Sequence, residues 1–201
     1  DRAYLAGWIP PPEPFVSAAI VSRTPECDIT EEQQPERVRC AYVSDNFLET
    51  FGMRVALGRD FTPEDDVRGA PPVIIISHEL WMRRFGGAPD AVGRTLNIGA
   101  LPIPIIGVLP PDFETPRGES AGLWLPSQIF PIPPKSATMS SFIIPFGRLN
   151  PGVTPQQAEA AVAPLIEEEA KVLRRGPGDD YRPRVRSLRA YQVGNAPRTA
   201  W

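Results

Sequence analysis

Residues 43–65 read VSDNFLETFGMRVALGRDFTPED, a stretch that predicts a short helix near its start. The helix is predicted over residues 44–52, where Ser44 is placed to cap its start and Gly52 to end it. A helix this short needs packing to be stable, so it should cover a hydrophobic core. The apolar residues predicted to form its buried side are Phe47, Leu48 and Phe51.

The same stretch ends in acidic residues. Thr62 as a cap and Pro63 at the first helical position predict a further helical turn. Carboxylates at a helix start are common, because they complement the positive end of the helix dipole. They could also ligate calcium, but their spacing is not that of an EF-hand loop, so a metal site is the less favoured interpretation. The acids concerned are Asp60, Glu64, Asp65 and Asp66.

A strand followed by a helix is predicted next. The run VIII at residues 73–76 is β-branched and predicts a buried strand. Ser77 should cap a helix over residues 78–85, which Gly86-Gly87 ends. Leu80, Trp81 and Phe85 are expected to face the core, and Arg83 and Arg84 to be solvated.

The two cysteines lie in the first predicted hairpin. Residues 15–23 and 37–43 are β-like, with the connecting loop at 31–35, so Cys27 and Cys40 should lie on facing strands. Two thiols cannot complete a tetrahedral metal site by themselves. A disulfide and a pair of reduced thiols both remain open at this point.

A second hairpin is predicted over residues 95–98 and 103–109, around a Gly99-Ala100 turn. Pro102 and Pro104 cannot donate ladder hydrogen bonds, so this strand should lie at an edge or direct those positions outward. Further strands are predicted over residues 123–126, 141–149 and 183–193.

The best helix signal begins at Thr154, which forms a capping box with Gln157 and precedes Pro155 at the first helical position. Its apolar positions recur at helical spacing, which predicts one buried stripe. The stripe consists of Ala158, Ala161, Val162, Leu165, Ile166 and Leu173.

The order of these elements predicts an α+β fold with an insertion in its middle. The chain has 201 residues, enough for one compact unit or two subdomains that share a core. Its 26 prolines disfavour long helices, while 42% apolar residues argue against wholesale disorder. Residues 1–14 end in Pro10-Pro11-Pro12-Glu13-Pro14 and are predicted to form an extended, polyproline-like lead-in.

Charge and hydropathy exclude several classes of protein. The 21 Lys and Arg residues against 24 Asp and Glu residues give a net charge of −3, so no nucleic-acid partner is expected. No run approaches the roughly 18 to 20 apolar residues that cross a bilayer. The chain begins without methionine and is expected to be a soluble piece of a longer protein.

The sequence predicts no catalytic residue, cofactor site or metal site. His78 is the only histidine, and beside Glu79 it could serve a hydrolase as a base. A structural role at a helix start is the favoured interpretation of this histidine. Walker A, dinucleotide-binding and zinc-protease motifs are absent.

Several phrases resemble the extracytoplasmic core domain of MacB/FtsX-type ABC transporter permeases. The first are VSDNF (43–47), FGM (51–53) and LGRDFTPED (57–65). As a set, in order and spacing, the phrases are specific, and they cover roughly residues 37–193. The others are VIIISHELW (73–81), RFGG (84–87), VGRTL (92–96), IIGVLPPDF (105–113), LWLP (123–126) and RLNPGVT (148–154).

The resemblance implies two subdomains and a cellular location. Residues 15–60 and 141–193 would form a porter-like α/β subdomain, with 61–140 as a β-rich inserted subdomain. Residues 194–201 would be a tail leading to a missing transmembrane helix. The domain would lie in the bacterial periplasm as part of an inner-membrane protein, which favours a Cys27–Cys40 disulfide.

The resemblance also implies a function. The domain would be non-catalytic, would transmit ATP-driven motion, and would contact substrate or a periplasmic adaptor protein. Its partners would be the transmembrane helices of its own permease and, indirectly, a cytoplasmic ATP-binding subunit or domain, in a dimeric permease. The alternatives are a stand-alone binding or sensor module for a peptide or lipid, and a hydrolase that uses His78.

Overall fold

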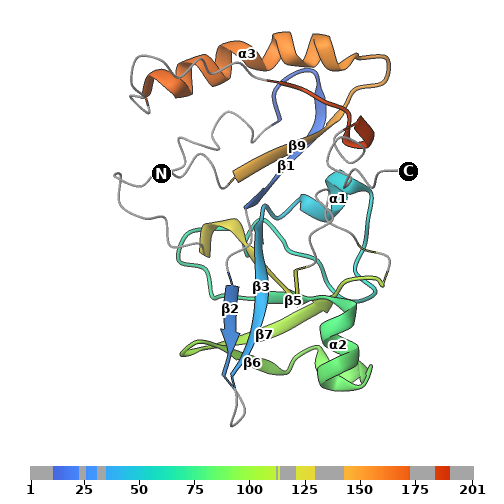
Figure 1. The fold of residues 1–201 in the computed structure, drawn as a ribbon, viewed down its shortest axis with the longest axis vertical. Coiled ribbons are helices and arrows are strands. Elements are labelled where there is room, and N and C mark those ends of the chain that lie inside the picture. Colours follow the sequence, from blue (N-terminus) through green and yellow to red (C-terminus); the bar gives the residue numbers. More distant parts are fainter. Residues whose placement is uncertain are drawn as a thin grey trace, which may run out of the picture. The chain divides into compact units, whose positions relative to one another are not determined.

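The computed structural model of this chain describes residues 11–22, 26–30, 35–111, 113, 121–129, 143–172 and 184–190. These residues form an α+β fold, as predicted, which divides into two compact units (Figure 1). Unit 1 is Asp1–Ala18 with Gly147–Trp201, and unit 2 is Ala19–Phe146. The elements are β1 (Phe15–Ser22), β2 (Glu26–Ile29), β3 (Glu36–Val43), α1 (Phe47–Phe51), β4 (Leu57–Gly58), β5 (Ile74–Ile76), α2 (His78–Phe85), η2 (Pro89–Ala91), β6 (Thr95–Ile98), β7 (Leu101–Val108), β8 (Leu123–Pro126), η3 (Ser127–Ile129), β9 (Ile143–Leu149) and α3 (Pro155–Val172).

The predicted subdomain boundaries are not those of the compact units. Residues 19–60, which we expected to belong to the porter-like subdomain, lie in unit 2. The first and last segments of the chain do share unit 1. The porter-like and inserted subdomains therefore stay a prediction from the resemblance.

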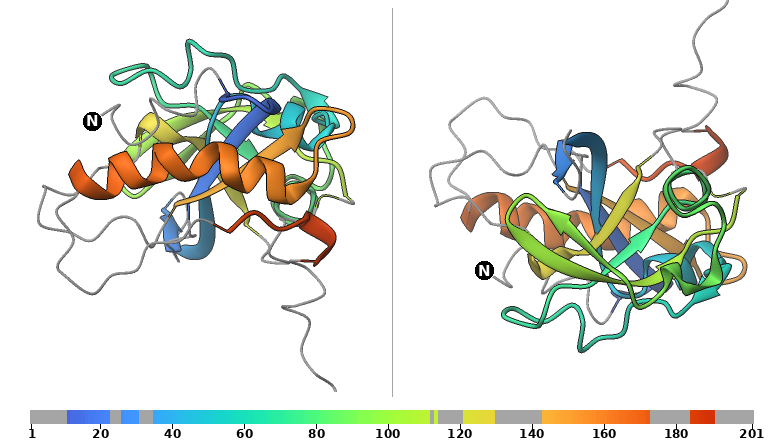
Figure 2. Two further views of the ribbon diagram at one scale, coloured as in Figure 1. Left: turned by 90° about the horizontal axis from the view of Figure 1, so that it is seen from above. Right: turned by 90° about the horizontal axis from the view of Figure 1, so that it is seen from below.

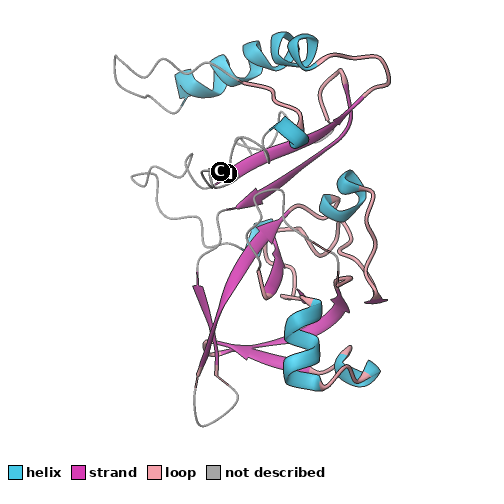
Figure 3. Ribbon diagram, turned by 45° about the vertical axis from the view of Figure 1, so that its right-hand side comes forward, coloured by secondary structure: helices cyan, strands magenta, loops and turns pink. Residues whose placement is uncertain are grey.

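Six strands of unit 2 close into a ring of pairings, in the order β2, β6, β7, β5, β8, β3 and back to β2. Neighbours run antiparallel except for β3 with β8 and β5 with β7, which are parallel. β1 extends the sheet beyond β3, where Val21 faces Val43, and β9 follows β1 in the strand order. Figure 3 shows α2 next to the lower strands of this ring. Closure protects the backbone of these strands from further pairing.

Strand β3 faces two hydrophobic clusters, because side chains alternate along a strand. Val38 and Cys40 belong to a cluster that draws on all six strands of the ring and on Leu80 of α2. Ala41 and Val43 belong to a second cluster, which includes α1. The most buried large side chains, such as Trp124 and Leu123 of β8, also divide between these two clusters.

Helix α1 begins later than predicted. Its N-cap is Asn46, and no side chain caps it. The hydroxyl of Ser44 instead accepts a hydrogen bond from the Ile20 backbone N–H at 3.1 Å and donates to Asn46 Oδ1 at 2.8 Å. The prediction of Ser44 as the cap is therefore wrong, because a strand far away in the sequence supplies its partner. Gly52 ends the helix in the left-handed conformation, as predicted.

The buried side of α1 forms an aromatic cluster. Phe47 is 1% exposed, and its ring centroid lies 4.8 Å from that of Phe51 and 5.5 Å from that of Trp124. Phe113 packs edge-on against Trp124, with the ring centroids 4.9 Å apart. Leu48 is also buried, so the predicted packing side is confirmed.

The phrase LGR at residues 57–59 marks a close approach of two backbones. Arg59 donates its backbone N–H to the carbonyl oxygen of Ile106, and Ala56 donates to that of Val108. A β-carbon on Gly58 would lie 2.2 Å from the Ile106 oxygen, and one on Gly107 would lie 2.6 Å from the Arg59 oxygen. Real β-carbons do not approach so closely, so both positions require glycine.

The strand and helix predicted from residues 73–85 are confirmed as β5 and α2. The Ser77 hydroxyl accepts a hydrogen bond from the Leu80 backbone N–H at 3.1 Å, and Gly86 ends the helix. Leu80 is fully buried, while Trp81 and Phe85 are partly buried against the same cluster. The indole of Trp81 donates to the carbonyl of Ala88, which fixes the chain after the helix.

β6 and β7 form an antiparallel hairpin, drawn in light green in Figure 2. Its two prolines lie where the strand donates no ladder hydrogen bond. Ile105 donates its backbone N–H to the Arg94 carbonyl, toward β6. Because successive backbone N–H groups of a strand point in opposite directions, the nitrogens of Pro102 and Pro104 point away from β6. β7 pairs with β5 only from Ile105 onward, so no hydrogen bond is lost at either proline.

Unit 1 has its own small core. Phe15 of β1 packs with Ala158 and Val162 of α3, while Leu149 and Val185 lie against them. The capping box is confirmed, because Gln157 donates its backbone N–H to Thr154 Oγ1 and accepts from the Thr154 N–H. Ala161, predicted to belong to the buried stripe, is exposed.

The strand predicted over residues 183–193 is wrong for its described part. Residues 184–187 have no regular structure, and Leu188–Ala190 are helical. The hydroxyl of Ser187 accepts the Ala190 backbone N–H at 3.2 Å, which favours a helical turn over a strand. The predictions for residues 1–10, 31–34, 173–183 and 194–201 lie outside the described residues.

The contact between β4 and β7 predicts a steric effect at one glycine. Gly107→Ala should lower the free energy of unfolding by about 1–3 kcal/mol, because the new methyl group collides with the Arg59 carbonyl. Urea denaturation followed by tryptophan fluorescence measures the change. Gly122→Ala is the control, since its β-carbon would lie 3.4 Å from the nearest atom, Val38 Cβ. Equal losses in both variants would contradict the steric explanation.

Candidate functional site

His78 has no catalytic arrangement around it. It occupies the first position of α2, and its ring packs edge-on against Trp81, with the ring centroids 5.4 Å apart. Within the described part of the chain, no serine, cysteine or carboxylate forms a hydrogen bond with this imidazole. The geometry therefore favours the structural role over the hydrolase hypothesis.

The acidic residues after β4 stabilise a turn. Arg59 forms two hydrogen bonds with the Asp65 carboxylate, with Nη1–Oδ2 at 2.6 Å and Nη2–Oδ1 at 3.1 Å. The same carboxylate accepts the backbone N–H of Thr62 at 2.8 Å. The hydrogen bond from Arg59 holds the pKa of Asp65 below its ordinary value, although burial acts in the opposite direction. Residues 63–66 form a single turn, in which Asp65 donates its backbone N–H to the Thr62 carbonyl at 2.9 Å, and no regular helix follows it.

Asp66 connects this turn to η3, the short helix after β8. Its carboxylate accepts hydrogen bonds from the Gln128 backbone N–H at 2.9 Å and from the Ser127 hydroxyl at 3.0 Å. Burial raises the pKa of Asp66 to about 6, although both hydrogen bonds favour the charged form. The negative charge of Asp45 adds to the rise.

Several carboxylates lie near Asp45, which itself interacts with Asp66. Burial raises the pKa of Asp45 and of Asp60, and the nearby charge of Glu49 adds to both shifts. In the described residues, no three histidine, cysteine, aspartate or glutamate side chains are arranged to hold a metal ion. Of the four acids considered as calcium ligands, Asp60 accepts the Phe61 backbone N–H, and Asp65 and Asp66 have the partners described above.

Cys27 of β2 and Cys40 of β3 are joined as a disulfide in the structure, with their Cα atoms 5.9 Å apart. The two cysteines lie on facing strands, as expected, with Cys27 opposite Val38 in the ladder. The strand of Cys27 is separate from the one predicted over residues 15–23. Cys40 is fully buried, and both residues contact the cluster shared by the six strands. The oxidation state of the protein in its compartment stays a prediction.

A charged cluster that the sequence did not indicate connects β3 to α2. Arg83 and Arg84 both donate to the carboxylate of Glu36, and the Arg84 Nη1–Glu36 Oε2 distance is 2.9 Å. Burial would raise the pKa of Glu36, but the two arginines outweigh it and lower this pKa. The prediction that Arg84 is solvated is wrong, since its side chain is only 13% exposed. No local sequence pattern could predict this contact, because Arg84 and Glu36 are 48 positions apart.

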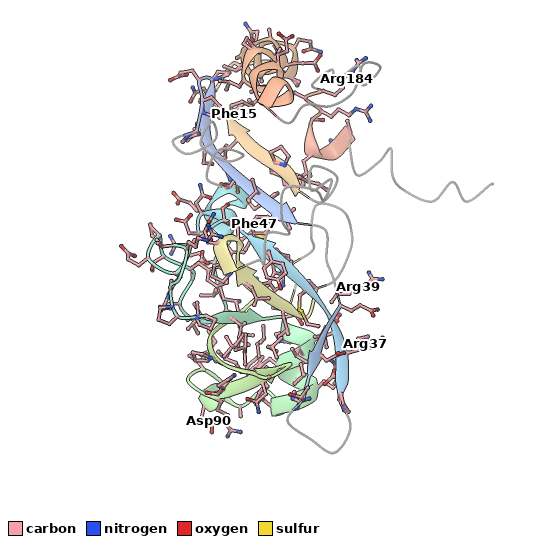
Figure 4. The ribbon with its side chains drawn as sticks, turned by 90° about the vertical axis from the view of Figure 1, so that its left-hand side faces the viewer. Phe15, Arg37, Arg39, Phe47, Asp90 and Arg184 are labelled. Atoms are coloured by element: carbon pink, nitrogen blue, oxygen red, sulfur yellow. A yellow bond between two sulfur atoms is a disulfide. The ribbon has the colours of Figure 1, made fainter. Side chains whose placement is uncertain are left out.

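The outer face of the β2–β3 hairpin is charged. Arg37 pairs with Asp28 at 3.2 Å and with Glu26 at 3.5 Å across the strands. Arg37 and Arg39 point away from the hairpin (Figure 4). Exposed pairs of this kind contribute little to stability, so this face is a solvated surface.

The family model of the MacB-like periplasmic core domain matches residues 10–165. The chain belongs to this family. The match confirms the resemblance inferred from the sequence and covers both the ring of strands and most of α3.

The curated relatives of this chain are named as export ATP-binding/permease proteins. The chain is 26% identical over 152 residues to the macrolide export ATP-binding/permease protein MacB of Chromobacterium violaceum, which covers 69% of this chain and 22% of that protein. It is 31% identical over 87 residues to a probable syringafactin export ATP-binding/permease protein of Pseudomonas syringae, which covers 42% of this chain and 13% of that protein. The chain thus spans less than a quarter of the length of these relatives.

Solved structures show the same fold. The periplasmic region of MacB from Actinobacillus actinomycetemcomitans aligns with a TM-score of 0.61 at 16% identity, covering 79% of this chain and 69% of that one. The extracellular domain of the transporter YknZ from Gram-positive bacteria aligns with a TM-score of 0.59 at 16% identity, covering 79% of this chain and 78% of that one. None of the helices in the described residues has the length and apolar character needed to span a membrane.

The disulfide predicts a stability difference that depends on reductant. Reducing the Cys27–Cys40 bond, whose cysteines are 13 residues apart, should lower the free energy of unfolding by about 3 kcal/mol. Urea denaturation with and without a phosphine reductant measures this loss. The double variant Cys27→Ala, Cys40→Ala should not respond to reductant. Two free thiols in oxidised periplasmic protein, found by Ellman titration after denaturation, would reject the disulfide.

The raised pKa of Asp66 predicts that the domain becomes more stable as the pH falls from 7 to 5. Its pKa in the fold is about 6, above that of an unfolded aspartate, so the folded protein binds the proton more tightly. This contribution is fully present below about pH 4 and is lost as the pH rises through 6. The melting temperature should therefore rise between pH 7 and pH 5, and Asp66→Asn should reduce the rise. Asp65→Asn, with a pKa shift of opposite sign, should keep it, and an unchanged rise in Asp66→Asn would contradict the assignment.

Proposed function

We propose that the chain is a non-catalytic periplasmic domain of an ABC export permease, which carries ATP-driven motion from the membrane helices to a substrate or a periplasmic adaptor. Membership of the MacB-like periplasmic core domain family supports the transporter context. The curated relatives combine ATP-binding and permease parts in proteins much longer than this chain. The ATP-binding part would act on this domain indirectly, through the transmembrane helices of a dimeric permease.

The observation that carries the proposal is the way in which the chain passes between its two units. The first passage, between Ala18 and Ala19, lies within β1, and the second, between Phe146 and Gly147, lies within β9. β1 and β9 are neighbours in the strand order, so the unit that holds both ends of the chain continues into the other through strands. Because a strand is almost fully extended, it would lengthen little under load, which supports the proposed transmission of motion.

The polar residues of the described chain support the same conclusion. Arg59, Asp65, Asp66 and Glu36 all bind groups of the fold itself, and His78 has no catalytic partner there. These side chains would keep the domain folded while it is moved. Its contribution to transport would then be mechanical movement and contact with a partner.

Excision of unit 2 tests this role in the full-length permease. Replacing Ala19–Phe146 with a short glycine–serine turn should leave ATP hydrolysis and abolish export, because the moving part is removed. Export and ATP hydrolysis are measured with the protein reconstituted in vesicles. The control His78→Ala should keep both activities. Export by the excised permease would contradict the proposal, and lost export in His78→Ala would revive the hydrolase hypothesis.

A further inference from the structure

Residues 184–190 form a basic segment on unit 1, here called the arginine arm. Arg184, Arg186 and Arg189 are exposed, and within the described part of the chain none of them has an ion pair or a side-chain hydrogen bond. The sequence around them carries only positive charge, since residues 181–201 contain five arginines and no aspartate or glutamate. This stretch contrasts with the net charge of −3 of the whole chain.

The arm is held in a defined conformation beside α3 (Figure 4). Val185 packs into the small core of unit 1, and its backbone N–H donates to Glu159 Oε2 of α3 at 2.9 Å. Val185 is partly buried, whereas Arg184 and Arg186 on either side of it are exposed. The helical turn capped by Ser187 then presents Leu188 and Arg189, and Leu188 is 37% exposed.

Other arginines of the chain are used differently. Five described arginines pair with carboxylates of the same unit. Among the described residues, Arg39, Arg54 and Arg68 have no ion pair, and they stand apart in the sequence. Only in the arm do three unpaired guanidinium groups occur within six described residues. The paired arginines are Arg37, Arg59, Arg83, Arg84 and Arg94.

We propose that the arginine arm binds the anionic headgroups of a phospholipid surface. A guanidinium group presents two parallel donors that match the oxygens of a phosphate. An exposed leucine between such groups can enter the interfacial layer, as in peripheral segments that combine basic and apolar side chains. Segments on the outer side of a membrane are usually poor in arginine, so a cluster there calls for a function.

A lipid surface suits the arm better than a protein partner does. The three arginines are spread over a turn and an irregular segment, so they offer a row of exposed charges beside one exposed leucine. Repeated phosphates on a surface can neutralise such a row in any register. The excess of acidic residues elsewhere in the chain would be repelled by the same surface, so binding would be confined to the arm.

Vesicle sedimentation with the 201-residue chain tests the proposal. The probe is vesicles of equal parts phosphatidylglycerol and phosphatidylcholine at about 50 mM salt, where electrostatic attraction extends over more than 10 Å. The wild type should bind, and the triple variant Arg184→Gln, Arg186→Gln, Arg189→Gln should lose about 100-fold in partition coefficient. Raising the salt to about 500 mM should release the wild type.

A matched control removes the same charge elsewhere. Arg39→Gln, Arg54→Gln, Arg68→Gln changes three exposed arginines of unit 2 and should bind as the wild type does. Equal losses in both triple variants, equal binding to pure phosphatidylcholine, or no binding by the wild type would overturn the proposal. Self-association of the wild type that weakens with salt and is lost only in the arginine-arm variant would also overturn the proposal. In that case the arm would bind acidic residues of a second copy of the chain. None of these outcomes bears on the proposed export role, which the excision of unit 2 tests separately.

Discussion

Strand β3 is the element on which unit 2 depends, because three strands and both hydrophobic clusters meet on it. It pairs with β2 on one side, with β8 on the other, and with β1 at its end. The alternation of its side chains places Cys40 in one cluster and Ala41 in the other. The disulfide and the Glu36 cluster attach β2 and α2 to the same strand. A shift of β3 by one residue would exchange the two clusters, so its register is strongly fixed.

The phrases that carry the family resemblance have structural explanations. In LGRDFTPED, Gly58 permits the backbone contact with β7, Arg59 and Asp65 close the turn, and Phe61 is buried. Asp66 then attaches the turn to η3 at the cost of burying a carboxylate. These residues therefore stabilise the fold of the domain.

Features that depend on residues close in the sequence could be predicted, whereas contacts between residues far apart in the sequence could not. The Ser77 cap, the Gly52 and Gly86 stops and the Thr154–Gln157 box each involve residues within a few positions, so the sequence alone identifies them. Ser44 was assigned to the wrong role because its partner Ile20 is 24 residues away. The Arg84–Glu36 and Asp66–Ser127 contacts are 48 and 61 residues apart, and no spacing rule joins such pairs. The last segment was predicted as a strand from its apolar positions, but Ser187 caps a helical turn there.

We expect this domain to move when ATP binds to the rest of the permease. Energy transfer from a dye on Arg68→Cys to an acceptor lipid reports the distance of unit 2 from the membrane, and Arg68 is exposed. Cys27 and Cys40 are joined to each other, so neither would take the dye. In reconstituted full-length permease, transfer efficiency should change on addition of a non-hydrolysable ATP analogue. An efficiency that stays constant, in protein that hydrolyses ATP and exports its substrate, would contradict the account.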